Sequence, residues 1–238
     1  KDLNKIKIKI KKIFKISKFD NENSIQTKLV PFHKGRIKLK KEVVPIGKKL
    51  KHRVKNNHLS PDQWNKFILR KDSFIIDTRK EFEFKIGTFK NSINPKINNF
   101  RNFSKYFRKY KKNSKIGMFC TGGIRCEKAS DYLKSKGYTN IFQLKGGIIN
   151  YLSKIDKKKS LWKGECFVFD NRVSVNHNLK SGKYSICAGC REPISFKDKN
   201  SSKFEEGVSC PSCYDKSTES QKSRFRMRQS QIYKAKQS

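Results

Sequence analysis

The stretch that decides how this chain folds is Phe119-Cys120-Thr121-Gly122-Gly123-Ile124-Arg125-Cys126-Glu127. It leaves an apolar run, turns through two glycines and enters a helical pattern, so that backbone N–H groups converge on one point. Cys120 stands at that point, where a thiolate and any anion attached to it are stabilised. Glycines are needed because side chains would block the convergence. We therefore expect an anion cradle around the Cys120 sulfur, formed by Thr121, Gly122, Gly123 and Ile124.

Arg125 follows the cradle directly. Its positive charge favours the ionised thiol, so we expect it to lower the pKa of Cys120 further. Local chemistry alone leaves two other interpretations open, which are a phosphate-binding loop with an incidental cysteine and a buried structural thiol.

Strands and helices are expected to alternate on both sides of the loop. Ser60-Pro61-Asp62-Gln63 supplies a capping hydroxyl, a proline for the first helical turn and a glutamine for a capping box, so a helix starts there. The remaining elements are a strand over 73–77, a helix over 106–111, a strand over 116–119, a helix over 127–136 ended by Gly137, a strand over 140–143 and a helix after Gly146-Gly147. This alternation predicts an α/β domain with a parallel sheet flanked by helices.

The first fifty residues have a different pattern. Charged and apolar residues alternate in Ile6-Lys7-Ile8-Lys9-Ile10 and in Arg36-Ile37-Lys38-Leu39-Lys40, the period of a half-buried strand. Residues 1–55 are therefore expected to form part of a small α+β unit. Because the chain begins at Lys1 without an initiator Met, we expect its native start and the first strands of that unit upstream.

The charge of the chain is extreme. Its 238 residues include 58 Lys and Arg against 20 Asp and Glu, a formal net charge of +38. Such a charge favours polyanions such as nucleic acid. A merely well-solvated cationic surface is the alternative, since a bias toward Lys, Asn and Ile also follows from A- and T-rich codons. With no long apolar run and no signal peptide, we expect a cytoplasmic protein without membrane contact.

Seven cysteines in a chain without a signal peptide indicate a reducing compartment, where thiols serve metals or catalysis. Two CxxC pairs separated by nineteen residues have the spacing of a zinc ribbon. We expect residues 160–216 to form a Cys-rich, zinc-ribbon-like region, because a metal would supply the folding energy that so few apolar residues cannot. The expected ligands are Cys187, Cys190, Cys210 and Cys213. Four reduced or redox-active thiols without metal are the alternative.

Residues 217–238 are expected to form a basic terminal helix or arm. Three arginines stand close together in a chain that otherwise prefers lysine, and beside Lys222 they would grip phosphates. Phe225 and Tyr233 would stack on bases. A solvated helix face is the alternative. The arginines are Arg224, Arg226 and Arg228.

The loop after Phe119 resembles the active-site loop of rhodaneses, in which a cysteine heads a short cradle and carries sulfur as a persulfide. This resemblance implies that Cys120 is the nucleophile and that Arg125 closes the cradle. Cys126 lies six residues after Cys120, where many rhodaneses have a small hydroxyl residue. It is either a thiol that resolves an oxidised or persulfidated Cys120 or a packing residue.

A second rhodanese-like motif lies upstream. Ile76-Asp77-Thr78-Arg79, followed by Glu83 and Gly87, resembles the Asp-x-Arg and Glu-x-x-x-Gly-His motifs of rhodanese domains. Asp77 and Arg79 are therefore candidate accessory residues. Thr88 stands where the superfamily usually has His, which weakens any role for a histidine there and leaves the cysteine chemistry untouched.

From roughly Val30 onward the chain resembles the rhodanese-type tRNA uridine hydroxylase family. The motifs that carry this resemblance are CTGGIRCEKAS over 120–130, LKGGIINYL over 144–152, the run from Trp162 to Val173, the paired CxxC and SRFRMRQSQ over 223–231. The resemblance implies a rhodanese domain over 58–156 and a partial acylphosphatase-like unit over 1–55. It also implies that the wobble uridine of certain tRNAs is converted to 5-hydroxyuridine with molecular oxygen as co-substrate.

Two other function classes remain in view. Fold and loop chemistry alone favour a general sulfurtransferase that uses a Cys120 persulfide. A non-enzymatic RNA-binding scaffold is the third class, against which the retained Cys120 and Arg125 count. Cys166, in an apolar run, is expected to be a buried strand residue rather than a catalytic one. No flavin or nicotinamide motif, no facial iron triad and no protein partner can be recognised.

Overall fold

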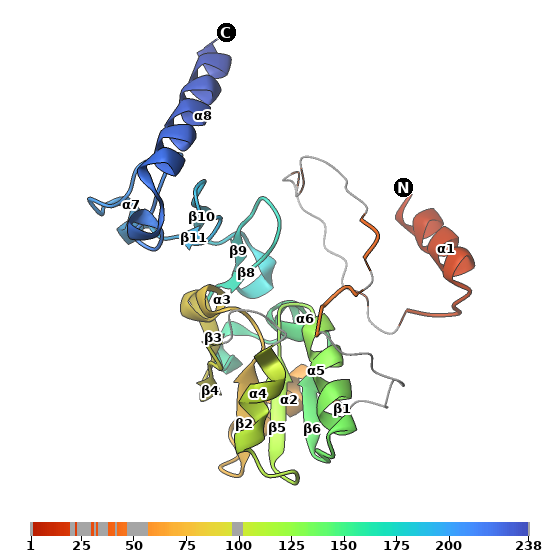
Figure 1. The fold of residues 1–238 in the computed structure, drawn as a ribbon. Coiled ribbons are helices and arrows are strands. Elements are labelled where there is room, and N and C mark those ends of the chain that lie inside the picture. Colours follow the sequence, from red (N-terminus) through yellow and green to blue (C-terminus); the bar gives the residue numbers. More distant parts are fainter. Residues whose placement is uncertain are drawn as a thin grey trace.

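The computed structural model describes residues 2–19, 22, 30, 32, 38–40, 42–46, 57–96 and 102–237 of the chain. Its centre is a five-stranded sheet in the order β1-β6-β5-β2-β4, in which every pairing is parallel (Figure 1). The strands are β1 (Asn57–Leu59), β2 (Ser73–Asp77), β4 (Ser92–Ile93), β5 (Lys115–Phe119) and β6 (Ile141–Leu144).

Helices cover both faces of this sheet because parallel strands need crossover connections. On one face α2 (Pro61–Ile68) and α6 (Gly147–Lys154) pack around Trp64, Phe119 and Tyr151. On the other face α4 (Phe103–Tyr106) and α5 (Ile124–Ser135) pack around Met118 and Leu133. The expected α/β fold with a parallel sheet flanked by helices is confirmed.

Local signals place most of these elements where the sequence predicts them. The Ser60 hydroxyl accepts a hydrogen bond from the Gln63 N–H, and the Gln63 side chain accepts one from the Ser60 N–H, so the expected capping box is formed. The helix expected over 106–111 is displaced toward the N-terminus. It consists of α4 and the 3-10 turn η2 (Phe107–Lys109), because Phe103 and Phe107 are the residues that bury their rings.

Residues after the last crossover helix complete the same domain. After α6 and the 3-10 turn η3 (Lys157–Lys159), β7 (Trp162–Gly164) pairs antiparallel with β3 (Gly87–Phe89), which follows α3 (Glu81–Ile86). Next, β8 (Cys166–Phe167) pairs with β9 (Ser174–Val175), before the turn η4 (His177–Leu179). The side chains of Trp162, Cys166 and Leu179 belong to the core around Trp64. The α/β domain therefore extends to about residue 180.

The chain ends in a small Cys-rich unit and a long helix. The unit contains the hairpin of β10 (Ser185–Ile186) and β11 (Pro193–Ile194), α7 (Phe196–Lys199) and the turn η5 (Tyr214–Lys216). The helix expected at the C-terminus is α8 (Glu219–Gln237), and it projects away from the rest of the molecule (Figure 1).

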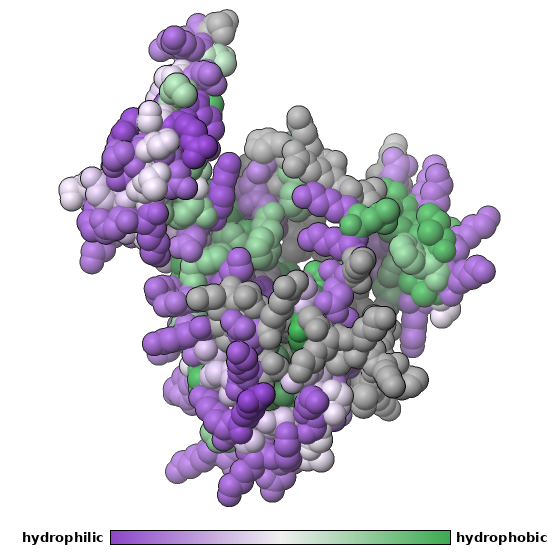
Figure 2. All heavy atoms as spheres, in the orientation of Figure 1, coloured by the Kyte–Doolittle hydropathy of each residue, from purple (hydrophilic) through white to green (hydrophobic). Residues whose placement is uncertain are grey.

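The strand expected at Ile6 to Ile10 is wrong, because α1 (Leu3–Phe14) is a helix there. Leu3, Ile6, Ile10 and Ile13 also recur at helical spacing, and a helix satisfies its own backbone whereas a strand needs a partner. No strand of the described residues lies beside this segment, and its apolar side chains form an exposed patch (Figure 2). Residues 38–40 are not in a strand, and Arg36, Ile37 and most of the expected 1–55 unit lie outside the described residues.

Candidate functional site

The loop between β5 and α5 places the Cys120 sulfur among backbone donors. The Gly123 N–H donates to Cys120 Sγ at 3.1 Å, and the N–H groups of Arg125 and Cys126 also favour the ionised form of this sulfur. Gly123 has a φ of +93°, which turns its N–H inward and which a residue with a side chain would rarely adopt. Cys120 itself is 2% exposed. The first turn of α5 therefore forms part of the expected cradle.

The other side of the loop is held by α6. The N–H groups of Ile148 and Ile149 donate to the carbonyl oxygens of Cys120 and Thr121 at 3.0 and 3.1 Å. A Cβ on Gly147 would lie only 2.5 Å from the Thr121 oxygen, so this close approach requires glycine. These bonds fix the carbonyl oxygens of the loop on α6, while the Gly123 N–H on the loop's other side points to the Cys120 sulfur.

The electrostatics of the loop favour a thiolate at Cys120. Burial alone raises the pKa of this thiol, but the Cys126 thiol, the Arg125 charge and the backbone N–H groups outweigh burial and lower the pKa to about 6. Burial and the neighbouring Cys120 sulfur raise the pKa of Cys126 well above its usual range. Of the two sulfurs, Cys120 is therefore the one that ionises and Cys126 the one that keeps its proton.

Cys126 is buried and faces Cys120. Its Sγ also lies 3.6 Å from the hydroxyl of Thr78, which donates to the Phe119 carbonyl at 3.0 Å. Cys126 thus packs at the start of α5, in the same core cluster as Cys120. Its burial therefore fits both the resolving thiol and the packing residue expected from the sequence. Cys166 lies in β8 with no exposed surface, as expected, and burial raises the pKa of its thiol to about 12.

Arg125 is held by a buried carboxylate from α3. Its guanidinium donates to both oxygens of Glu83 at 2.8 and 2.9 Å and to the hydroxyl of Thr121 at 3.3 Å. Glu83 has no exposed surface. Burial alone raises the pKa of Glu83, but the bonds from Arg125 dominate and keep it below the usual value. In the sequence, only the position of Glu83 after Asp77 and Arg79 pointed to this residue. That position did not show that Glu83 pairs with Arg125.

Asp77 and Arg79 form a second buried pair behind the first. The Arg79 guanidinium donates to both Asp77 oxygens at 2.9 and 2.7 Å and to the Gly87 carbonyl at 2.6 Å. Thr88, at the position where rhodanese domains usually have His, donates to Asp77 at 3.2 Å. These residues do not contact the Cys120 sulfur. They fix the ends of β2 and β3, between which α3 presents Glu83 to Arg125.

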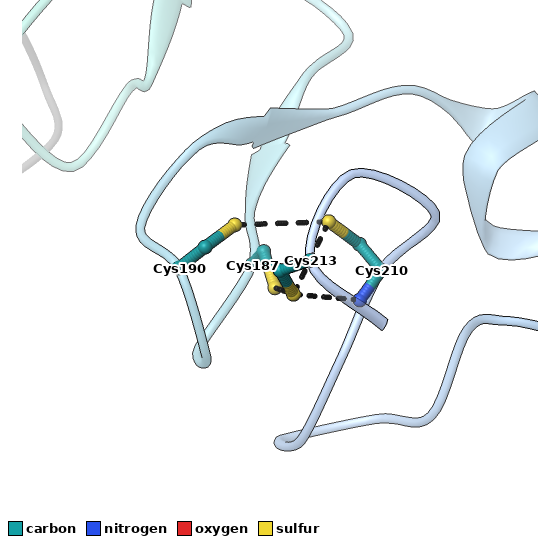
Figure 3. A group of neighbouring side chains, drawn as sticks. All are labelled: Cys187, Cys190, Cys210 and Cys213. Carbon is teal, nitrogen blue, oxygen red and sulfur yellow. Dashed lines mark hydrogen bonds between the residues drawn. The ribbon is translucent and has the colours of Figure 1, made fainter. Parts of the chain in front are cut away.

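The four cysteines of the Cys-rich unit meet at one point (Figure 3). Their sulfurs all lie within 4.8 Å of one another, with separations of 3.9 Å between Cys187 and Cys213, 3.7 Å between Cys190 and Cys210, and 3.8 Å between Cys210 and Cys213. A tetrahedral metal with bonds of about 2.3 Å separates its sulfurs by about 3.8 Å. The donor set and its spacing fit a metal ion, and the cluster could hold one.

The three arginines of α8 do not form one cluster. Arg226 donates to both oxygens of Glu205 at 2.6 and 2.7 Å. Arg228 donates to the carbonyl oxygens of Gly207 at 2.7 Å and Ala188 at 3.3 Å. Arg224 is exposed and has no partner among the described residues. Only Arg224 is therefore free for a ligand. Within the described part of the chain, no helix is long and apolar enough to cross a membrane.

Comparison with known proteins agrees with this site. Residues 60–154 match the family described as Rhodanese-like domain, so the sheet and its cysteine loop define a rhodanese domain. The chain is similar to a single-domain sulfurtransferase from Saccharomyces cerevisiae, 18% identical with a TM-score of 0.36 over 42% of this chain and 92% of that one. A rhodanese-related protein from Thermoplasma volcanium is 24% identical with a TM-score of 0.35, over 40% of this chain and 90% of that one.

A comparison over nearly the full length is more specific. The tRNA uridine(34) hydroxylase of Pelagibacter ubique strain HTCC1062 is 59% identical over 236 residues, which are 99% of this chain and 78% of that protein. The chain therefore belongs to the tRNA uridine(34) hydroxylase family.

Proposed function

We propose that this protein hydroxylates the wobble uridine of tRNA to 5-hydroxyuridine, with molecular oxygen as co-substrate. The observation that carries the proposal is the identity of 59% over 99% of the chain with a tRNA uridine(34) hydroxylase. The formal charge of +38 suits a polyanionic substrate. We place the reaction in the cytoplasm, with tRNA as the partner.

In this proposal Cys120 is the catalytic nucleophile, able to carry a persulfide. With a pKa of about 6, roughly nine-tenths of Cys120 is thiolate at pH 7, and a thiolate is the reactive form. The buried sulfur is reached only by a group that enters the loop, so we propose that the target base leaves its stack to do so. The N–H groups around the sulfur would stabilise the thiolate, a persulfide or an anion that forms beside them.

Arg125 completes the cradle in the proposal. Its bidentate bond with Glu83 fixes the guanidinium beside the loop, and its side chain keeps 19% of its surface exposed. Asp77 and Arg79 are assigned a positioning role, because they support α3 and do not touch the sulfur. Cys126 is assigned the role of a hydrogen-bond donor to the Cys120 thiolate, since its raised pKa keeps it protonated.

We propose that the four-cysteine cluster holds one zinc ion. Four thiolates close a tetrahedral site and leave no open position, so the metal would be structural. Its ligands would be Cys187, Cys190, Cys210 and Cys213, from two turns that have little apolar core of their own. Zinc would then supply the energy that folds this unit.

The test is mass spectrometry of wobble nucleosides from tRNA incubated with the protein in air and under nitrogen. We expect 5-hydroxyuridine in air alone. Unmodified uridine in air, with a folded protein that binds the tRNA, would contradict the proposal.

The second candidate is a general sulfurtransferase, which the N–H donors around the Cys120 sulfur favour. A rhodanese cradle of this kind suits a persulfide as well as a thiolate. Thiosulfate and cyanide distinguish the two functions. Rapid thiocyanate formation together with no 5-hydroxyuridine would replace the first proposal with the second.

A further inference from the structure

The N-terminal half of α8 is docked on the Cys-rich unit by one face. Lys222 is 5% exposed, and its Nζ lies 3.9 Å from the centroid of the Tyr214 ring. Arg226 bonds to Glu205, as described above. Gln229 packs against Gly207, where a Cβ would lie 2.3 Å from the glutamine Oε1. The helix therefore lies directly against the loop that leads into the second CxxC turn.

Arg228 joins the two cysteine turns to the helix. One of its nitrogens, Nη2, donates both to the carbonyl of Ala188, inside the first CxxC turn, and to that of Gly207, three residues before Cys210. These carbonyls come from turns that are about twenty residues apart in the chain. They lie within reach of one guanidinium only when the two turns are side by side, and a metal bound by both CxxC pairs holds them that way.

The opposite face of α8 is not packed against any of the described residues. We call this the free face. Its residues are all exposed, and most of them recur every three or four positions along the helix. Arg224 and Lys234 have no hydrogen-bond or ion-pair partner among the described residues, and Glu219 is the only acidic residue of the helix. The free face consists of Ser220, Ser223, Arg224, Met227, Ser230, Gln231 and Lys234.

The composition of the free face fits a nucleic-acid backbone. Arginine and lysine pair with phosphates, while serine and glutamine donate hydrogen bonds to phosphate and sugar oxygens and leave room for close approach. The positive charge of the whole chain gives the same complementarity on a larger scale.

We propose that the free face of α8 binds the sugar-phosphate backbone of tRNA, and that Arg228 makes this binding depend on the metal in the four-cysteine cluster. The inference rests on the proposed tRNA substrate. Arg224 and Lys234 are the RNA contacts, whereas Arg228 is a positioning residue and Arg226 a helix anchor. Because linkage is reciprocal, the docked helix also raises the affinity of the cluster for the metal. We expect this gain to appear as slower transfer of the metal to a chelator.

The test uses the full-length, zinc-loaded chain and four variants. Arg224→Gln removes a contact of the free face, Arg228→Gln removes the bridge, and Arg228→Lys keeps the charge on a shorter side chain without the Nη2 donor. Arg108→Gln is the matched control, since Arg108 is an exposed arginine on the α/β domain with no partner among the described residues. Two quantities are measured: affinity for a fluorescent anticodon stem-loop at several salt concentrations, and the rate of zinc transfer to a chelator.

We expect Arg224→Gln to weaken RNA binding several-fold and to lower the salt slope by about 1, with zinc transfer unchanged. Arg228→Gln and Arg228→Lys should both accelerate zinc transfer, expose α8 to protease and weaken RNA binding. Chelation of the wild type should weaken RNA binding to the level of Arg228→Gln and add little to that variant, because both changes release the same helix.

Two results would overturn this inference without contradicting the proposed function. One is RNA affinity in Arg224→Gln equal to that of Arg108→Gln, and the other is unchanged zinc transfer and protease resistance in Arg228→Gln, each with a wild type that hydroxylates tRNA. A wild type that neither binds nor modifies the RNA would refute the proposed function, and the RNA part of the inference with it. The zinc transfer rates would still decide the role of Arg228.

Discussion

Replacing Cys126 by alanine should raise the pKa of Cys120. In the folded protein the pKa of Cys120 is lowered from 9.0 to about 6, which favours the thiolate. The Cys126 side chain, as a hydrogen-bond donor to the thiolate, makes the largest contribution that lowers this pKa. A hydrogen bond to a charged group contributes about 1.5 to 3 kcal/mol, so its loss should move the pKa to between about 7 and 8.

The assay is alkylation of Cys120 by iodoacetamide as a function of pH, followed by mass spectrometry of the peptide that contains it. At pH 6 the thiolate fraction should fall from about one half to about a tenth or less, which slows alkylation at least about fivefold. At pH 9 the two proteins should react at similar rates. Cys126→Ser is the matched control, because a serine hydroxyl still donates a hydrogen bond and should keep the pKa low.

The result that would refute this reasoning is an unchanged pH midpoint in a folded Cys126→Ala protein. Cys126 would then be a packing residue only. A loss of tRNA modification in Cys126→Ser as complete as that in Cys120→Ser would instead make the two cysteines a redox couple.

Further changes test the rest of the site. Cys120→Ser should abolish 5-hydroxyuridine formation and leave the melting temperature within a few degrees, because serine nearly matches the volume but forms no thiolate; full activity of the folded variant would refute the role of Cys120. Glu83→Gln leaves Arg125 without its buried carboxylate and should cost about 3 kcal/mol in urea unfolding, whereas Glu81→Gln, which breaks only an exposed pair, should cost under about 1. Equal stability of the two variants would mean that the Glu83 pair is not structural. Elemental analysis should find one zinc per chain, lost toward acid pH as thiolates are protonated, and chelation should open residues 184–216 to protease while the α/β domain resists. A metal-free chain with an already resistant Cys-rich unit would exclude zinc, and the ligands would then be packing or redox residues: Cys187, Cys190, Cys210 and Cys213.

Much of the fold could be read from the sequence because its signals are local. The capping box at Ser60 joins residues three apart, and the strand, glycine turn and helix around Cys120 follow one another directly. The two CxxC pairs also carry their own spacing. Such patterns depend only on residues that are close together in the chain, so they can be recognised from the sequence alone.

The alternating segment at Ile6 shows where a local pattern is insufficient. Isoleucine at every second position satisfies the period of a strand, but Leu3, Ile10 and Ile13 satisfy that of a helix equally well. The choice depends on whether another strand is available for pairing, and this is a property of the fold and not of the segment.

By itself, the sequence determined that Cys120 heads a cradle, that the domain is α/β, and that four cysteines can close one site. Only the tertiary structure decided that Glu83 holds Arg125 and that the Cys126 thiol lies beside the Cys120 sulfur. It also decided that Arg226 and Arg228 bond to groups of the protein, whereas Arg224 has no partner among the described residues. The physical reason is that a charged or polar side chain takes its partner from whatever the fold brings within about 3 Å, and that partner is set by strand order and helix packing across tens of residues.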